Sequence, residues 1–181
     1  MTVPSAIHAP INQTPEKMGK ELLAELRKSQ EECDVTKVLS LIAAKANYEE
    51  RSINNETPII YAALQGHTEC MKALIAAGAK VNEYNYSGFT ALMYAAGFGW
   101  TDCVKILIEA GANIAQQDFS DKNAMDWLLL SNDKGQHEEI KRILNKAVET
   151  ARIKFLQDTD CSKGLAVPMK APKTLQIRHT P

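Results

Sequence analysis

The chain repeats itself with a period of 33 residues. The segment TPIIYAALQGHTECMKALIAAGAKVN, which starts at Thr57, aligns without gaps with TALMYAAGFGWTDCVKILIEAGANIA, which starts at Thr90. Thirteen of the 26 aligned positions are identical. A period between about 20 and 50 residues is typical of a stack of supersecondary units, each of which buries its apolar face against its neighbours.

Each copy has the pattern of two short helices joined by a tight turn. Thr57 can cap the first helix, and Gly66 permits the sharp reversal that follows it. Thr68, and Thr101 one period later, can cap the second helix. Gly78 then ends the second helix as a C-terminal capping glycine. The sequence therefore predicts two consecutive helical hairpins.

Two weaker copies flank this pair. Residues 34–47 align with the second helix of the first clear copy, with Lys45 in the place of the terminating glycine. The helix before it is predicted to begin at residues 14–16, with four apolar side chains on one face. These are Met18, Leu22, Leu23 and Leu26. On the other side, residues 123–130 are predicted to form a first helix, and HEEIKRIL begins the second after a longer turn near residues 132–134.

The period of 33, the Thr-Pro start at Thr57, the G-H-T-E turn and the LIAAGAKVN close resemble ankyrin repeats. The resemblance implies an all-α solenoid of helix-turn-helix units with β-turn fingers. Its four repeats would cover residues 15–51, 52–84, 85–117 and 118–148. The Thr-Pro-Leu-His start of the family reads TPII, TALM and NAMD here, so its histidine is absent. Asn55 and Asp121 stand where glycine is usual, and both residue types tolerate left-handed backbone angles.

The two ends differ from the stack in composition. Residues 1–14 are expected to be flexible, and residues 158–181 are polar, contain proline and are expected to be disordered. Between them, the helical pattern of the last repeat continues through residues 149–157 without a glycine to end it. This extension either folds back on the last repeat or docks a partner.

Composition disfavours several classes of protein. The formal net charge of the 181 residues is -1, which gives no drive toward nucleic acid or an anionic membrane. No apolar run reaches the roughly 18 to 20 residues that span a bilayer, and the N-terminus lacks the pattern of a secretory signal. Four cysteines without paired spacing indicate a reducing compartment and free thiols, and Cys70 and Cys103, at equivalent places on successive second helices, are predicted to be half-buried. The four cysteines are Cys33, Cys70, Cys103 and Cys161. We expect a monomeric cytoplasmic protein, with a nuclear location or signal-independent delivery into a host cell left open.

Two stretches superficially resemble catalytic motifs. GHTEC, residues 66–70, contains the H-x-E of zinc deaminases, but the chain has no C-x-x-C to complete the site, and Trp100 replaces His67 one period later. GFGWTD, residues 97–102, resembles a phosphate-binding loop, yet a predicted helix precedes it where the motif requires a strand. We therefore expect no catalytic residues, no metal and no cofactor. An enzyme with an unrecognised site is the remote alternative.

The resemblance also implies where a partner would bind, because ankyrin-like stacks make contacts through the fingers and the first-helix face. The residues at these positions are Ile53, Asn54, Glu56, Tyr84, Tyr86, Ser87, Phe89, Phe98, Gln117, Phe119 and Lys122, with Trp100 in the adjoining turn; Leu64, Gln65, Gly97 and Ser120 occupy further such positions. Five of the 11 aromatic residues of the chain are among the finger and helix positions, and exposed aromatics are enriched in binding hot spots.

The sequence thus predicts a non-catalytic module that binds a protein partner as a scaffold, adaptor, inhibitor or targeting element. A host-directed effector or regulatory subunit, with a second docking site in the C-terminal helix and tail, is the alternative.

Among the aromatic residues at the predicted contact positions, Phe89 and Tyr84 could pack against the next finger instead of contacting a partner. Tyr61, Tyr94 and Trp127 recur 33 residues apart within the first helices and are expected to pack between repeats.

Overall fold

The computed structural model describes residues 14–131 and 137–158, and the structural statements that follow concern this part of the chain. It contains eight α-helices and one isolated antiparallel β-bridge, between Tyr84 and Thr90. The helices are α1 (Pro15–Leu26), α2 (Val35–Ala43), α3 (Pro58–Gln65), α4 (Thr68–Ala76), α5 (Ala91–Gly97), α6 (Thr101–Glu109), α7 (Ala124–Leu130) and α8 (His137–Asp158). The terminal segments predicted to be flexible or disordered, and the predicted longer turn near residues 132–134, lie outside the described residues.

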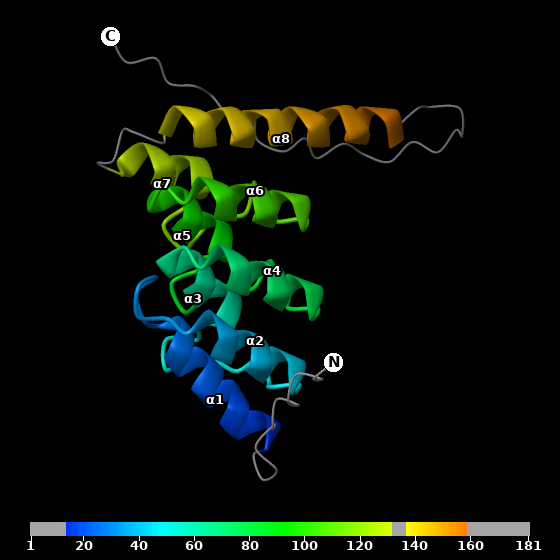
Figure 1. The fold of residues 1–181 in the computed structure, drawn as a ribbon. Coiled ribbons are helices and arrows are strands. Elements are labelled where there is room, and N and C mark those ends of the chain that lie inside the picture. The colour runs from blue at the N-terminus through cyan, green and yellow to red at the C-terminus, as the bar shows by residue number, and fades with distance from the viewer. Residues whose placement is uncertain (1–13, 132–136, 159–181) are drawn as a thin grey trace, which may run out of the picture.

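Consecutive helices pair into hairpins that stack in one direction (Figure 1). The odd-numbered helices form one layer, in which α1 packs on α3, α3 on α5 and α5 on α7. The even-numbered helices form the second layer in the same order. The predicted all-α repeat fold is confirmed.

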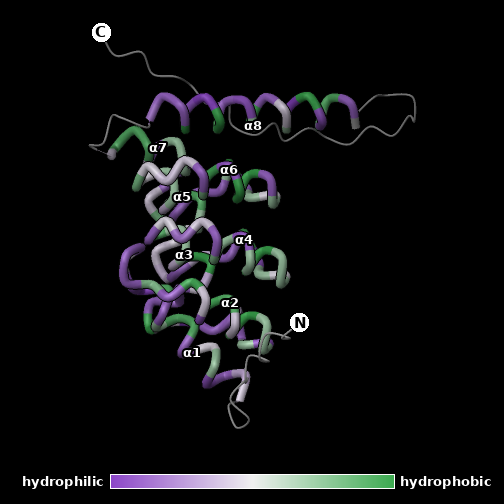
Figure 2. Tube along the Cα trace, viewed as in Figure 1, coloured by the Kyte–Doolittle hydropathy of each residue, from purple (hydrophilic) through white to green (hydrophobic). Residues whose placement is uncertain are grey.

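One hydrophobic core runs through the whole stack. Each hairpin contributes fully buried side chains to it, because a single hairpin is too small to bury its own apolar face. The largest are Leu22, Leu26, Ile59, Ile60, Met71, Leu74, Leu92, Met93, Leu107, Leu128, Ile140 and Leu144. Buried alanines, such as Ala62 and Ala95, leave the first helices room to approach each other closely. Hydrophilic segments lie over the loops that connect the hairpins and along much of α8 (Figure 2).

Helix starts agree with the prediction only in part. Thr90 accepts a hydrogen bond from the Met93 N–H at 3.4 Å and caps α5, whereas the equivalent Thr57 is the N-cap residue of α3 but makes no side-chain capping bond. The buried Oγ1 of Thr57 has no hydrogen-bond partner among the described residues. Thr68 and Thr101 are the first residues of α4 and α6, so the prediction that they cap these helices is wrong.

Helix ends follow the predicted glycine pattern. After α4, Gly78 has φ 94°, its N–H donates to the Ile75 carbonyl at 2.9 Å, and the next N–H donates to the Leu74 carbonyl at 3.0 Å. This pair of bonds is a Schellman motif, and it satisfies carbonyls that the helix leaves unpaired. Lys45 adopts the same conformation after α2, with φ 60°. Asn55 and Asp121 also have positive φ, as predicted.

The three cysteines in the described part of the chain are free, and Cys70 and Cys103 are more deeply buried than predicted. Cys70 and Cys103 are essentially inaccessible to solvent, and Cys33 is also buried. Cys161 lies outside the described residues. Burial raises the pKa of the Cys70 thiol to about 12, so it is a thiol rather than a reactive thiolate at neutral pH.

The last helix, α8, has 22 residues and extends beyond the end of α6 (Figure 1). Ile140 and Leu144, in its first half, are fully buried against the stack. Residues 149–157 continue the same helix, and all of them are exposed. The expectation that the second half folds back on the last repeat is therefore wrong, and a docking role for it stays a prediction. Within the described residues, no helix combines the length and the apolar character needed to cross a membrane.

Lys45 gives a direct test of the helix-end geometry. In the left-handed region a residue with a Cβ is less favourable than glycine by about 1–2 kcal/mol. Part of this advantage of glycine is lost, because glycine increases the conformational entropy of the unfolded chain. We expect Lys45→Gly to raise the free energy of unfolding by about 0.5–1 kcal/mol in urea denaturation. Lys45→Ala is the control, since it removes the side chain but keeps the Cβ. Equal free energies of unfolding of Lys45→Gly and Lys45→Ala would contradict the left-handed conformation of residue 45.

Candidate functional site

The finger before α5 is held by the side chain of Asn85, which is buried at its base. The Asn85 Oδ1 atom accepts hydrogen bonds from the N–H groups of Ser87, at 2.9 Å, and Phe89, at 3.0 Å. Gly88, between them, has φ 83° and lets the chain reverse. The Asn85 N–H closes the loop by donating to the Phe89 carbonyl at 3.1 Å. The finger is thus fixed by four backbone groups and one side chain.

The same bonds recur one period away on either side. Ser52 Oγ accepts from the N–H groups two and four residues further on, each at 3.2 Å. Asp118 Oδ1 accepts from the equivalent groups at 2.7 Å and 3.0 Å. Sequence reasoning missed these three finger anchors, Ser52, Asn85 and Asp118. The 33-residue spacing was the signal, but the residues share no chemical identity beyond a side-chain oxygen.

Neighbouring fingers are also bonded to each other. The Tyr86 N–H donates to the Asn54 carbonyl, and the Phe119 N–H donates to the Ser87 carbonyl, both at 3.2 Å. Successive fingers therefore form a ladder with one backbone hydrogen bond at each step. This ladder fixes the relative positions of residues that are 32 apart in sequence.

The first-helix aromatics connect the fingers to the helices. Asn85 Nδ2 donates to the Tyr94 hydroxyl at 3.0 Å, and the Trp127 indole Nε1 donates to Asp118 Oδ2 at 2.9 Å. The predicted packing between repeats is present at Trp127, because its ring lies 4.7 Å from that of Phe89 in the preceding repeat, centroid to centroid. Phe89 also lies 5.1 Å from Tyr94 of its own repeat. Tyr94 and Trp127 therefore both anchor the fingers, and Trp127 also packs between repeats.

Asp118 is a charged anchor. Burial by itself would raise the pKa of its carboxyl group. The N–H groups of Lys122 and Ser120, together with the Trp127 indole, more than offset this effect, and the pKa lies below its ordinary value. A carboxylate accepts stronger hydrogen bonds than a neutral acid. The last finger is therefore held more firmly than it would be by a protonated Asp118.

Most of the predicted contact residues are exposed on these fingers. Ile53 is 93% exposed, Phe119 72% and Tyr86 70%, which is unusual for large apolar side chains. Tyr84 and Phe98 are also exposed. The remaining exposed members of the predicted set are Asn54, Ser87, Gln117 and Ser120. We call Ile53, Tyr84, Tyr86, Phe98 and Phe119 the finger surface.

Two of the predicted contact residues make contacts within the stack. Glu56 is only 7% exposed, and Ser52 Oγ donates to its Oε2 atom at 3.2 Å. Burial and the Glu56 carboxylate together raise the pKa of Tyr61 and of Tyr94, so this carboxylate faces the first-helix hydroxyls. Trp100 is partly buried, and its Nε1 donates to the Leu64 carbonyl at 3.2 Å. The burial of Glu56 contradicts its predicted role in partner contact, whereas that of Trp100, which completes a contact within the stack but stays partly accessible, remains a prediction.

The predicted packing against the next finger is present for Tyr84, whereas Phe89 packs against first-helix rings instead. Phe89 is partly buried between two first-helix rings, as described above. Tyr84 meets Phe119 of the next finger edge to face, at 6.3 Å between ring centroids, yet about half of it stays exposed. Lys122 lies over the Trp127 ring, with Nζ 4.9 Å from the centroid.

The GHTEC stretch is a structural turn. His67 is buried, and its Nε2 lies 3.0 Å from the Lys28 carbonyl of the preceding repeat, so this nitrogen carries the proton. Burial lowers the pKa of His67 and favours the neutral ring. One period later Trp100 makes the same kind of bond to Leu64. Histidine and tryptophan exchange here because both present a ring N–H to the previous repeat.

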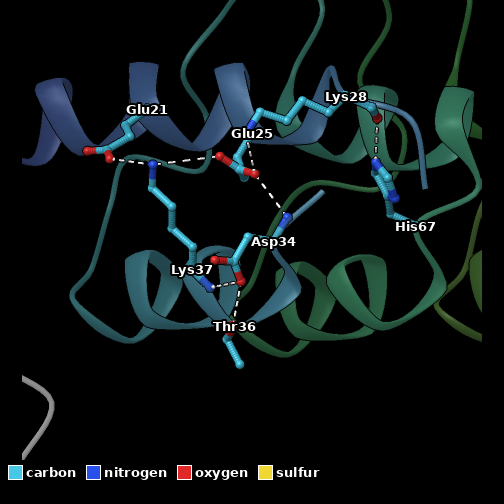
Figure 3. Close-up of polar contacts among 7 residues, drawn as sticks. All are labelled: Glu21, Glu25, Lys28, Asp34, Thr36, Lys37 and His67. Atoms are coloured by element: carbon cyan, nitrogen blue, oxygen red, sulfur yellow. Dashed lines mark hydrogen bonds and ion pairs between the residues drawn. The ribbon is translucent and has the colours of Figure 1, made fainter. Parts of the chain in front are cut away.

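A cluster of charged residues closes the first hairpin (Figure 3). Glu25 is buried, and its Oε1 atom accepts from Lys28 Nζ at 2.7 Å and from the Asp34 N–H at 2.9 Å. Lys37 Nζ lies 2.8 Å from Glu21 and 3.6 Å from Glu25. The Lys28 hydrogen bond is the main reason that the pKa of Glu25 is lowered. The cluster joins the end of α1 to the start of α2.

No group of three or more His, Cys, Asp or Glu side chains converges as metal ligands would in residues 14–131 and 137–158. An apolar cavity of about 270 Å³ does lie beside the finger surface, between α5 and α7. Its lining includes two residues that sequence reasoning missed, Met93 and Leu130. Leu130 follows the predicted contact position Gly97 by one period, so the repeat itself carried the signal.

The comparisons with known proteins agree with this architecture. A family model for ankyrin repeats, in three copies, matches residues 20–118, which is more than half of the chain. The chain belongs to the ankyrin repeat family. Repeats of this family are generally protein–protein interaction modules and are typically non-catalytic. A search of curated proteins finds no match.

The Glu25 cluster makes a prediction about pH. A lowered pKa means that the folded chain favours the carboxylate, so this stabilisation is present above the ordinary value of 4.5 and is lost as pH falls through the folded value. We expect Glu25→Gln to lower the free energy of unfolding by about 1–2 kcal/mol at pH 7, and the deficit to shrink below pH 4.5.

Glu21→Gln is the matched control for this measurement. Its partly exposed carboxylate pairs only with Lys37 among the described residues, and exposed ion pairs contribute about 0–1 kcal/mol. Urea denaturation from pH 3 to 8 compares the two variants with the unmodified chain. A Glu25→Gln deficit that is the same at every pH would contradict the role of the charge.

Proposed function

We propose that the chain is a non-catalytic interaction module that binds a protein partner through the finger surface and thereby scaffolds, inhibits or targets it. The observation that supports this most strongly is the exposure of Tyr86 and Phe119, two large aromatic side chains on adjacent fingers. Aromatic side chains bury much area for little loss of rotamer entropy, which is why they dominate binding hot spots.

The rigidity of the fingers supports the same proposal. Each finger is closed by its own anchor, and backbone bonds at Tyr86 and Phe119 tie adjacent fingers together. Binding by an ordered surface avoids the cost of ordering a loop on association. The two aromatic residues with the largest exposed fractions on the fingers therefore stand on backbone that folding has already fixed.

The double variant Tyr86→Ala, Phe119→Ala tests the proposal. Loss of two hot-spot side chains weakens binding by about 2 kcal/mol or more each, so partners captured from the source-cell lysate by the unmodified chain should be depleted at least about tenfold. Quantitative mass spectrometry measures the capture. Both side chains are mostly exposed, so we expect an unchanged helical circular dichroism spectrum.

Leu39→Ala is the control, because Leu39 is an exposed apolar residue on α2 and lies outside the finger surface. It should leave the captured set unchanged. Equal capture by the double variant and the control would contradict binding through the fingers.

A further inference from the structure

The cavity between α5 and α7 has a lining that is mostly apolar and aromatic. Its walls are Phe89, Met93, Tyr94, Phe98, Trp127 and Leu130, and its volume is about 270 Å³. Phe98 and Leu130 are exposed at its edge, whereas Met93 is buried. The Phe98 and Tyr94 rings are stacked at 6.5 Å between centroids and form one wall. The cavity thus opens next to the finger surface and shares Phe98 with it.

The polar ring atoms of the lining are already engaged on the finger side, while Ser131 lines the cavity at the end of α7. The Tyr94 hydroxyl accepts from Asn85, and the Trp127 Nε1 donates to Asp118. A polar group that entered the cavity would lose its water without gaining these atoms as partners, which is unfavourable. An apolar group would gain by leaving water.

Size and charge define the occupant further. A cavity of about 150 Å³ holds benzene, so one of about 270 Å³ accepts a single bulky side chain. Beside it, the Lys122 ammonium group lies over the Trp127 ring. The nearby Asp118 and Asp126 carboxylates each accept hydrogen bonds from backbone N–H groups. The Lys122 charge helps to lower the pKa of Asp118, but its ammonium group forms no ion pair among the described residues, so it can also complement a carboxylate supplied from outside the chain.

We propose that this cavity binds one bulky apolar side chain, a leucine, methionine, phenylalanine or tryptophan, of a partner peptide segment that carries an aspartate or glutamate beside it. The apolar side chain fills the cavity, and the acidic side chain pairs with Lys122. The inference rests on the proposed function, because it names the chemistry of the partner that the finger surface binds. It adds an anchoring position that the fingers alone do not supply.

Gly97 offers a way to close the cavity without disturbing the stack. It lines the cavity at the end of α5, and a Cβ placed there would lie 3.8 Å from Trp127 Cβ, an ordinary contact. Gly97→Ala therefore fits, whereas the longer side chain of Gly97→Leu extends into the space that the occupant needs. Phe98→Ala removes an exposed wall and provides a second variant should Gly97→Leu fail to fold.

The experiment is a selection of random dodecapeptides displayed on phage against the full chain, followed by affinity measurements on the enriched peptides by fluorescence polarisation. We expect the enriched peptides to share a bulky apolar residue with an acidic residue within two positions. Gly97→Leu and Phe98→Ala should each weaken their binding about tenfold or more, and Gly97→Ala much less. Lys122→Glu should weaken binding of the acidic peptides and leave that of their amide counterparts nearly unchanged.

Other results separate this inference from the proposed function. Peptides whose binding falls with Tyr86→Ala but not with Gly97→Leu or Phe98→Ala overturn the cavity and leave the finger surface in place. Enriched peptides without an acidic residue overturn the pairing with Lys122. A selection that enriches no peptide overturns the inference, while lysate capture still tests the fingers. Peptides that tolerate every one of these variants count against both proposals.

Discussion

One side-chain oxygen at the base of each finger holds the exposed part of this molecule in place. Ser52, Asn85 and Asp118 each accept two backbone N–H groups of their own finger. Without such an acceptor, these N–H groups would have to find water or remain unpaired, and the loop would lose its closed shape. The backbone bonds between fingers, and the direction in which the finger aromatics point, depend on that shape.

The finger anchors also connect the binding surface to the core. The second polar group of Asn85 reaches Tyr94, and that of Asp118 reaches Trp127, so a finger cannot move without disturbing a first-helix aromatic. The same two rings pack against Phe89 and line the cavity between α5 and α7. The polar edges of the two rings therefore form hydrogen bonds with the finger anchors, while their apolar faces line the cavity. Packing, finger geometry and the proposed anchoring position thus depend on the same side chains.

The sequence predicted where the elements lie better than what each side chain contacts. A 33-residue period predicts that Lys45, Asn55 and Asp121 replace glycines, and their positive φ values follow from that alignment. The period cannot tell which polar atoms meet across the stack. Glu56 has the sequence context of an exposed finger residue, yet it is buried, and its carboxylate raises the pKa of tyrosines from two different repeats. Its burial is decided by tertiary contacts that a single repeat does not contain.

Amide hydrogen exchange in Asn85→Ala, measured by NMR, tests the central claim most directly. The Phe89 N–H donates to Asn85 Oδ1, so its protection should fall about tenfold or more when that acceptor is removed. Asn82→Ala is the comparison, because Asn82 accepts from the Asn113 N–H and not from the finger. Asn82→Ala should lower the exchange protection of the Asn113 N–H and leave that of Phe89 unchanged. Unchanged protection of Phe89 in Asn85→Ala would show that the finger is held by something else.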